Sequence, residues 1–257
     1  MAASRGTGQE LLNRYTAADL AVFTPDEASR FDPEGCGDPR TEPALAWELL
    51  YRLEPELYDR LARAERLHAG VVAWLPRGVS RIAEVGAGTG RLTMELVERG
   101  RRVVAVEPAL PLRRILERKV AAAGLEDRVQ VTHGFFDRLP LPDGFADLVV
   151  ACSAFTPLPE HGGEAGLAEM ERVCRPGGHV AIIWPNHVDW LAAHGYRYVS
   201  FGGPMSVEFD SYREAAELAE IFYPAAADEV RRRGCRKVPF ELVGINPPRD
   251  LAVKLLT

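Results

Sequence analysis

Two acidic residues and a glycine-rich turn lie close together and could bind a ligand through side chains and backbone. Glu84 precedes the run Gly86-Ala87-Gly88-Thr89-Gly90, and Glu107 ends a second apolar run. Glycines let a backbone approach a ligand closely, and a turn into a helix leaves N–H groups unpaired. A carboxylate at a neighbouring strand tip can reach ribose hydroxyls. The spacing therefore indicates a nucleoside ligand.

The glycine spacing differs from the dinucleotide-binding fingerprint. That fingerprint is G-x-G-x-x-G, whereas this chain has G-x-G-x-G and carries Arg91 where the third glycine belongs. Nothing in the motif requires a pyrophosphate. A nicotinamide-dependent dehydrogenase and a tight turn without a ligand remain alternative interpretations.

The elements that position these residues form a regular alternation between about residues 80 and 185. Continuous apolar runs predict strands that are buried on both faces, and the segments between them predict helices. We expect strands at 81–85, 102–106, 128–133, 146–152 and 179–184, and helices near 91–99, 110–123 and 164–174. This alternation predicts an α/β fold with a parallel sheet.

Four segments in this order resemble the class I S-adenosylmethionine-dependent methyltransferases. They are EVGAGTG, AVEP, LPLPDGFADLVV and ERVCRPGGHVAIIW, and they cover most of residues 81–185. The resemblance implies a Rossmann-like three-layer sandwich with a mostly parallel seven-stranded sheet and an antiparallel final strand. N-terminal helices and a helical insertion after the fifth strand complete the expected fold. The implied cofactor is S-adenosylmethionine, and no metal site is expected.

The same resemblance assigns the cofactor-binding residues. The methionine end of the cofactor is expected at Glu84 and at the backbone of Gly86, Ala87, Gly88 and Gly90. The ribose diol is expected at Glu107, and the adenine near Pro108, Phe135 and Phe136. The sulfonium is expected near Cys152 and Ser153. The family often has Gly-Asp-Ala where this chain has Gly134-Phe135-Phe136, so the usual acid near the adenine amino group is missing. Asp137 or a backbone carbonyl could replace it, and a phenylalanine could stack on the base.

A general base is needed only if the methyl acceptor is still protonated when it reacts. His187 is our catalytic candidate because it follows the fifth expected strand directly and an imidazole titrates near neutral pH. His161 with Glu160, and Asp189, are alternatives. A surface or packing role competes with each of these assignments.

Other sequence features argue against other functions. The four cysteines form no C-x-x-C pair, and the formal net charge of −6 disfavours a nucleic-acid partner. Arg231, Arg232 and Arg233 are expected to end a helix. Asn246-Pro247-Pro248 is expected in a hairpin turn between two final strands. The N-terminus shows no leader pattern and no apolar segment reaches membrane-spanning length, so we expect a cytoplasmic protein without a membrane partner.

The chain is expected to divide into four parts. Residues 1–78 form an N-terminal helical lid with a long loop at 24–43, and 79–185 form the cofactor-binding core. Residues 186–238 form a helical insertion, rich in aromatic residues, that serves as the substrate cap, and 239–257 form a terminal β-hairpin that completes the sheet.

We therefore expect an S-adenosylmethionine-dependent methyltransferase that acts on O or N of a small organic molecule. A methyltransferase acting on protein or RNA is one alternative, and a non-catalytic S-adenosylmethionine-binding protein is another. The sequence leaves the substrate and the oligomeric state undetermined.

Overall fold

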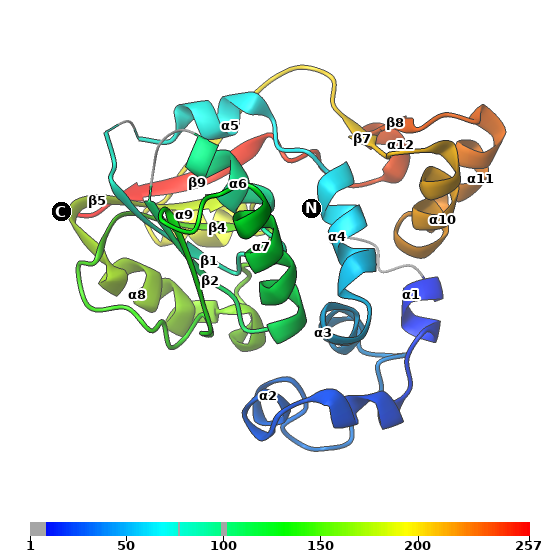
Figure 1. Ribbon diagram of the computed structural model, residues 1–257, viewed down its shortest axis with the longest axis horizontal. Helices are drawn as coiled ribbons and strands as arrows, with labels where there is room; N and C mark the ends of the chain where they lie inside the picture. Colours follow the sequence, from blue (N-terminus) through cyan, green and yellow to red (C-terminus); the bar gives the residue numbers. More distant parts are fainter. Residues whose placement is uncertain (1–8, 77, 99–101) are drawn as a thin grey trace. The chain divides into compact units, whose positions relative to one another are not determined.

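The computed structural model describes residues 9–76, 78–98 and 102–257. The chain forms two compact units (Figure 1). Unit 1 contains Met1–Arg66 and Pro204–Pro247, and unit 2 contains Leu67–Gly203 and Pro248–Thr257. The polypeptide therefore passes from one unit to the other after Arg66, after Gly203 and after Pro247.

Unit 2 is built on a seven-stranded sheet with the order β3-β2-β1-β4-β5-β9-β6. The strands are β1 (Arg81–Val85), β2 (Arg102–Val106), β3 (Val129–Thr132), β4 (Ala146–Cys152), β5 (Cys174–Ile183), β6 (Arg197–Ser200) and β9 (Asp250–Leu255). The first five strands pair in parallel, whereas β9 runs antiparallel to both β5 and β6. This arrangement confirms the expected Rossmann-like, mostly parallel sheet with an antiparallel final strand.

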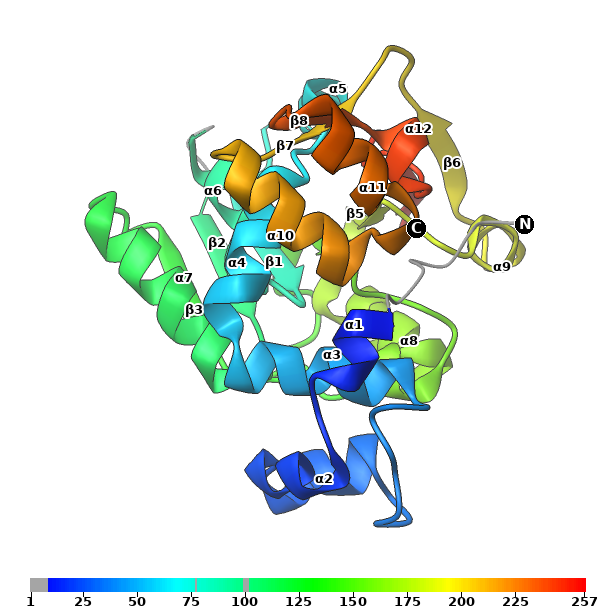
Figure 2. The same cartoon turned by 90° about the vertical axis from the view of Figure 1, so that its right-hand side faces the viewer.

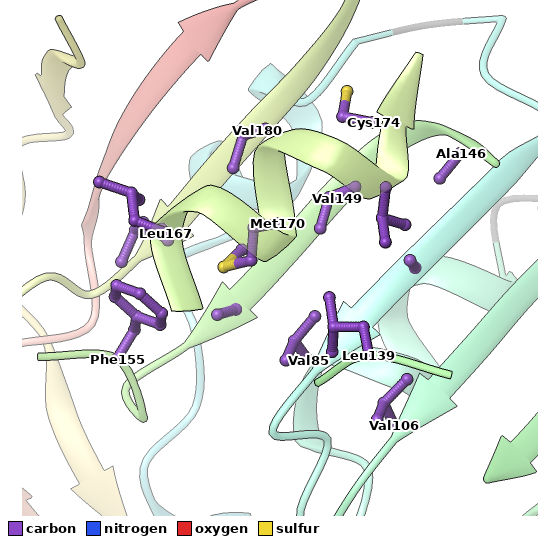
Figure 3. Close-up of a cluster of buried hydrophobic side chains, with 14 of the residues drawn as sticks. Val85, Val106, Leu139, Ala146, Val149, Phe155, Leu167, Met170, Cys174 and Val180 are labelled. Atoms are coloured by element: carbon purple, nitrogen blue, oxygen red, sulfur yellow. The ribbon is translucent and has the colours of Figure 1, made fainter. Parts of the chain in front are cut away.

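Helices cover both faces of this sheet. They are α5 (Ala69–Trp74), α6 (Arg91–Glu98), α7 (Leu110–Ala122), η2 (Pro159–His161), α8 (Gly163–Val173) and α9 (Val188–Ala193). Figure 3 shows α8 lying over the sheet, where Leu167 and Met170 share a buried cluster with Val149, Phe155 and Val180. Side chains alternate between the two faces of a strand. Ala83 and Val85 belong to the same buried cluster, whereas Glu84 points to the opposite face and meets α6.

Unit 1 is mainly helical. Its elements are α1 (Gln9–Asn13), η1 (Ala17–Val22), α2 (Pro25–Phe31), α3 (Pro43–Leu53), α4 (Pro55–Ala64), β7 (Ser206–Glu208), α10 (Tyr212–Phe222), α11 (Pro224–Arg233), β8 (Lys237–Pro239) and α12 (Phe240–Val243). Helices α10 and α11 pack against each other (Figure 2). Arg231, Arg232 and Arg233 lie in the last turn of α11, as expected. Among the helices of the described residues, none combines the length and apolar character needed to cross a bilayer.

The expected long loop at 24–43 is wrong, because α2 forms inside it. Thr24 accepts a hydrogen bond from the Glu27 backbone N–H at 3.3 Å, and the Glu27 side chain accepts one from the Thr24 N–H at 2.9 Å. Pro25 occupies the first helical turn, where a missing N–H carries no penalty. This capping box stabilises a short helix despite the surrounding proline and glycine residues.

The expected terminal hairpin is also wrong. The segment Phe240–Val243 is a helical turn that ends at Gly244, whose φ is +75°, and β8 pairs with β7 rather than with β9. Strand β9 is buried along Asp250–Val253 and pairs with a strand on each side. In the expected hairpin, the partner of β9 would have been the segment just before it in sequence, whereas the observed partners are β5 and β6. The second partner, β6, comes from the segment that we expected to be a helical insertion.

Candidate functional site

The glycine-rich turn links β1 to α6, and its backbone conformation explains why glycine occupies three of its positions. Gly86, Gly88 and Gly90 have φ values of +70°, +57° and +92°, which L-residues with side chains rarely adopt. A Cβ on Gly90 would lie 2.5 Å from Cδ1 of Leu116 on α7. The turn therefore requires glycine for its own shape as well as for any approach of a ligand.

Several backbone donors of this turn already have partners within the protein. The N–H groups of Gly86 and Ala87 both donate to the Val106 carbonyl, at 2.9 and 3.1 Å, and Gly90 donates to the Ala87 carbonyl at 2.9 Å. The structure thus differs from the expectation of unpaired donors at these three positions. The bonds from Gly86 and Ala87 fix the turn to the end of β2, and the bond from Gly90 closes the turn on itself.

Glu107 connects this turn to the loop after β2. Its carboxylate accepts hydrogen bonds from the Gly88 N–H at 2.8 Å and from the Ala109 N–H at 2.9 Å, and the residue is only 5% exposed. These two backbone bonds orient the Glu107 carboxylate between the glycine-rich turn and the loop after β2.

Glu84 is buried near the turn, and its pKa is raised. Its carboxylate accepts a hydrogen bond from the Thr93 hydroxyl of α6 at 2.5 Å. Burial raises the pKa of Glu84 to about 8, and the charge of nearby Glu107 adds to this rise. At neutral pH the uncharged form is favoured, so a positively charged ligand group would favour loss of this proton.

The two phenylalanines proposed near the adenine lie in different surroundings. Cζ of the Phe136 ring is 3.0 Å from the position that a Cβ on Gly86 would occupy, and Phe136 also packs edge-on against Phe155. Phe135 is buried and packs edge-on against His133, at a ring-centroid distance of 5.3 Å. Phe136 therefore borders the space in front of Gly86, and Phe135 packs beside His133.

The residues that follow β4 and β5 have an unusual backbone conformation. Cys152 ends β4, is half-buried and lies opposite Ile183. Ser153 and Trp184, the next residue after each strand, have φ values of +57° and +55°. No other non-glycine residue of the described ranges has a positive φ. Backbone strain of this type is concentrated at functional sites.

The proposed base, His187, lies on the same side of the sheet as these strand ends. It immediately precedes α9 and follows the end of β5 by a few residues, and its side chain is exposed. Within the described ranges, no hydrogen bond or ion pair joins its imidazole to another residue. His161 ends the short helix η2, and Asp189 lies in the first turn of α9.

Sequence reasoning missed two cations of α7 that contact the site. Arg113 Nη1 donates to the carbonyls of Glu107 and Pro108, both at 2.6 Å. Lys119 Nζ donates to the Thr89 carbonyl at 2.8 Å. These residues and Leu116 recur at intervals of three along the helix, which was the available signal.

The residues present fit an adenosyl cofactor. Glu107 provides a carboxylate held by two backbone N–H groups, and Glu84 provides a buried carboxyl for an ammonium group. The Thr89 hydroxyl is buried and has no hydrogen-bond partner among the described residues. A buried hydroxyl without a partner is costly, and a polar ligand group beside the turn would satisfy it.

Comparisons with known proteins find a related domain in this chain. Residues 82–178 match the family model described as a methyltransferase domain. An uncharacterised methyltransferase of Mycobacterium bovis is 36% identical over 116 residues, which are 44% of this chain and 43% of that protein. One from Geobacillus kaustophilus is 31% identical over 142 residues, covering 52% of this chain and 64% of that protein. The chain thus spans less than two thirds of these relatives.

A crystal structure of an S-adenosylmethionine-dependent methyltransferase from Aquifex aeolicus is similar with a TM-score of 0.46 and 24% identity, covering 60% of this chain and 91% of that one. The matched family segment runs from β1 through Gly178 of β5 and includes the glycine-rich turn, Glu107 and the strand end at Cys152. S-adenosylmethionine is the cofactor of this family. Residues 82–178 are therefore a methyltransferase domain.

Proposed function

We propose that the protein is an S-adenosylmethionine-dependent methyltransferase that transfers a methyl group to O or N of a small organic molecule. The observation that carries this proposal is the geometry of Glu107. Its carboxylate is buried and is oriented by one N–H from the glycine-rich turn and one from the loop after β2. A carboxylate fixed between these two loops suits a ribose diol.

The chain's residues would hold the cofactor in three places. Glu107 accepts hydrogen bonds from the ribose hydroxyls, Glu84 faces the amino group, and Thr89 offers its hydroxyl to the methionine carboxylate. Pro108, Phe135, Phe136 and Cys152 keep their proposed places near the adenine and the sulfonium. When bound, S-adenosylmethionine supplies a methyl group on a positively charged sulfur.

The protein's contribution to the transfer is then orientation and exclusion of water. Holding the acceptor atom in line with the methyl group contributes up to about 7 to 11 kcal/mol. For a hydroxyl or ammonium acceptor we propose His187 as the general base that takes the proton. Its position after β5 and its exposed imidazole support this role.

We further propose that unit 1 selects the substrate. The second segment of unit 1, Pro204–Pro247, begins four residues after the end of β6 at Ser200. Aromatic residues are frequent in unit 1, and aromatic side chains suit pockets for small organic molecules. A small-molecule acceptor and a cytoplasmic location are parts of the same proposal.

Two alternatives differ in what they require. A methyltransferase acting on protein or RNA would need a basic binding surface, and the acidic balance of the chain disfavours one. A non-catalytic S-adenosylmethionine-binding protein would bind the cofactor without transferring its methyl group to any compound in a broad acceptor screen.

The testing experiment compares the thermal stability of the protein with S-adenosylmethionine, S-adenosylhomocysteine, NADH and ATP. A ligand that binds only the folded state raises the melting temperature by mass action. We expect stabilisation by the two adenosyl ligands alone. Stabilisation by NADH, or by none of the four, contradicts the proposed cofactor and restores the dehydrogenase or the empty-turn interpretation.

A further inference from the structure

Helix α7 presents one face to both loops of the candidate cofactor site. Cδ1 of Leu116 lies 2.5 Å from the position that a Cβ on Gly90 would occupy, so α7 packs directly against the glycine-rich turn. Arg113 lies three residues before Leu116, and Lys119 lies three residues after it. Residues three apart on a helix share a face. The two cations therefore bracket the point at which α7 supports the turn.

Each cation is bound to backbone carbonyls of a site loop. Lys119 Nζ donates to the Thr89 carbonyl of the turn at 2.8 Å. Arg113 Nη1 donates to the carbonyls of Glu107 and Pro108, the two residues that begin the loop after β2, at 2.6 Å each. Hydrogen bonds from a charged donor are stronger than those between neutral groups.

The effect of these contacts on the site is a matter of orientation. Anchoring the Thr89 carbonyl fixes the peptide plane between Thr89 and Gly90 within the turn. Anchoring the carbonyls of Glu107 and Pro108 fixes the backbone from which the Glu107 carboxylate reaches Gly88 and Ala109. Both loops would otherwise sample more conformations before a ligand binds, and that freedom would be lost on binding.

We propose that Arg113 and Lys119 are positioning residues for the adenosyl cofactor. Lys119 holds the methionine side of the site, and Arg113 holds the ribose and adenine side. Neither residue needs to touch the cofactor. This inference rests on the proposed function and extends it to residues outside the glycine and acidic motifs.

Isothermal titration calorimetry with two probes, S-adenosylhomocysteine and adenosine, tests this division. Arg113→Met should weaken the binding of both probes about tenfold, because both require the loop after β2. Lys119→Met should weaken S-adenosylhomocysteine about tenfold while changing adenosine by less than about twofold. A purely structural defect would not separate the two probes in this way.

The adjacent residue provides a matched control. Arg114 lies on the same helix but is exposed, and no described residue pairs with its guanidinium. Arg114→Met removes the same charge and should change neither affinity by more than about twofold. Lys119→Arg retains a charged donor and should restore most of the affinity lost in Lys119→Met. If Arg113→Met does not fold, Arg113→Lys compared with Arg114→Lys makes the same test.

The outcomes separate the two levels of inference. If wild-type protein binds the probes and both Met variants bind like Arg114→Met, the positioning role is overturned and the proposed function stands. Equal losses for both probes in Lys119→Met overturn the assignment of Lys119 to the methionine side. A wild-type protein that binds neither probe overturns the proposed function itself.

Discussion

The two halves of the candidate site differ in which residues adopt a left-handed backbone. At the ends of β1 and β2, this conformation belongs to Gly86, Gly88 and Gly90, which adopt it without a steric penalty. At the ends of β4 and β5 it belongs to Ser153 and Trp184, for which it costs on the order of 1 kcal/mol or more each.

This difference separates two kinds of task. The first half is organised by backbone hydrogen bonds and by carboxylates, so its glycines serve the shape of the turn. The second half retains two side chains at positions that glycine would occupy more easily. We infer that the side chains of the second half contribute something that offsets the strain, as acceptor binding would.

The largest effect should appear in the second half, through His187. If His187 takes a proton from the acceptor, His187→Gln should lower kcat by about 100-fold or more, because a positioned base contributes about that much. The measurement is methyl transfer to an acceptor found by screening. His161→Gln is the control, and we expect it to retain activity. A fully active His187→Gln variant would exclude His187 as the base.

The first half should respond most strongly to loss of Glu107. Glu107→Ala removes the acceptor of two buried N–H groups and of the ribose diol, so affinity for S-adenosylhomocysteine should fall about 100-fold. Calorimetry checks this, with Glu117→Ala on the exposed face of α7 as the control. Equal affinity for the Glu107 variant would mean that another residue binds the ribose.

The shape of the turn can be tested without a ligand. Gly90→Ala combines a φ of +92° with a Cβ placed 2.5 Å from Leu116, and should lower the free energy of unfolding by about 2 kcal/mol. Gly202→Ala has no atom within 4 Å of its Cβ and no positive φ, so it should have little effect. Urea denaturation of both variants makes the comparison, and equal stabilities would contradict it.

Glu84 gives the first half a dependence on pH. Its pKa is about 8 in the folded protein and 4.5 in its ordinary state, so its stabilising effect is complete below pH 4.5 and is lost as pH rises through 8. Between these values the wild type should lose about 1 kcal/mol per pH unit relative to Glu84→Gln. Urea denaturation of the two ligand-free proteins from pH 5 to 8.5 measures this, and parallel curves would show that Glu84 is already ionised.

The smallest effect should come from relieving strain in the second half. Ser153→Gly should raise the free energy of unfolding by about 0.5 to 1 kcal/mol, since glycine accepts a φ of +57° freely. Ser200→Gly, in the extended strand β6, should have the opposite sign because glycine weakens a strand. Thermal denaturation of both variants decides whether the strain is real.

The sequence predicted the central sheet more accurately than its margins. The bounds of β1, β2 and β4 match the expected runs because each strand is apolar nearly throughout. Strand β6 was missed since RYVS is short, lies at the sheet edge and is mostly exposed. Its partner β9 is distant in sequence, so local patterns could not reveal their pairing.

In the candidate site, the residues that belong to sequence motifs were proposed from the sequence, and the others were missed. Glu84 and Glu107 could be proposed from the sequence, because Glu84 lies near the end of β1, Glu107 directly follows β2 and each belongs to a motif. Arg113 and Lys119 were missed because their helical spacing is a weak signal. They bind backbone carbonyls, and any long cationic side chain at that spacing can do so. The backbone conformations of Ser153 and Trp184 have no signature in the residue types themselves.

The position of β9 between β5 and β6 has a consequence for biosynthesis. β9 is translated only after Pro204–Pro247, so β5 and β6 must each wait with an unpaired edge while the whole second segment of unit 1 is made. Exposed strand edges pair readily with other chains. A nascent chain stalled between Ser200 and Asp250 should therefore be more prone to aggregate than one released after β9 has emerged from the ribosome.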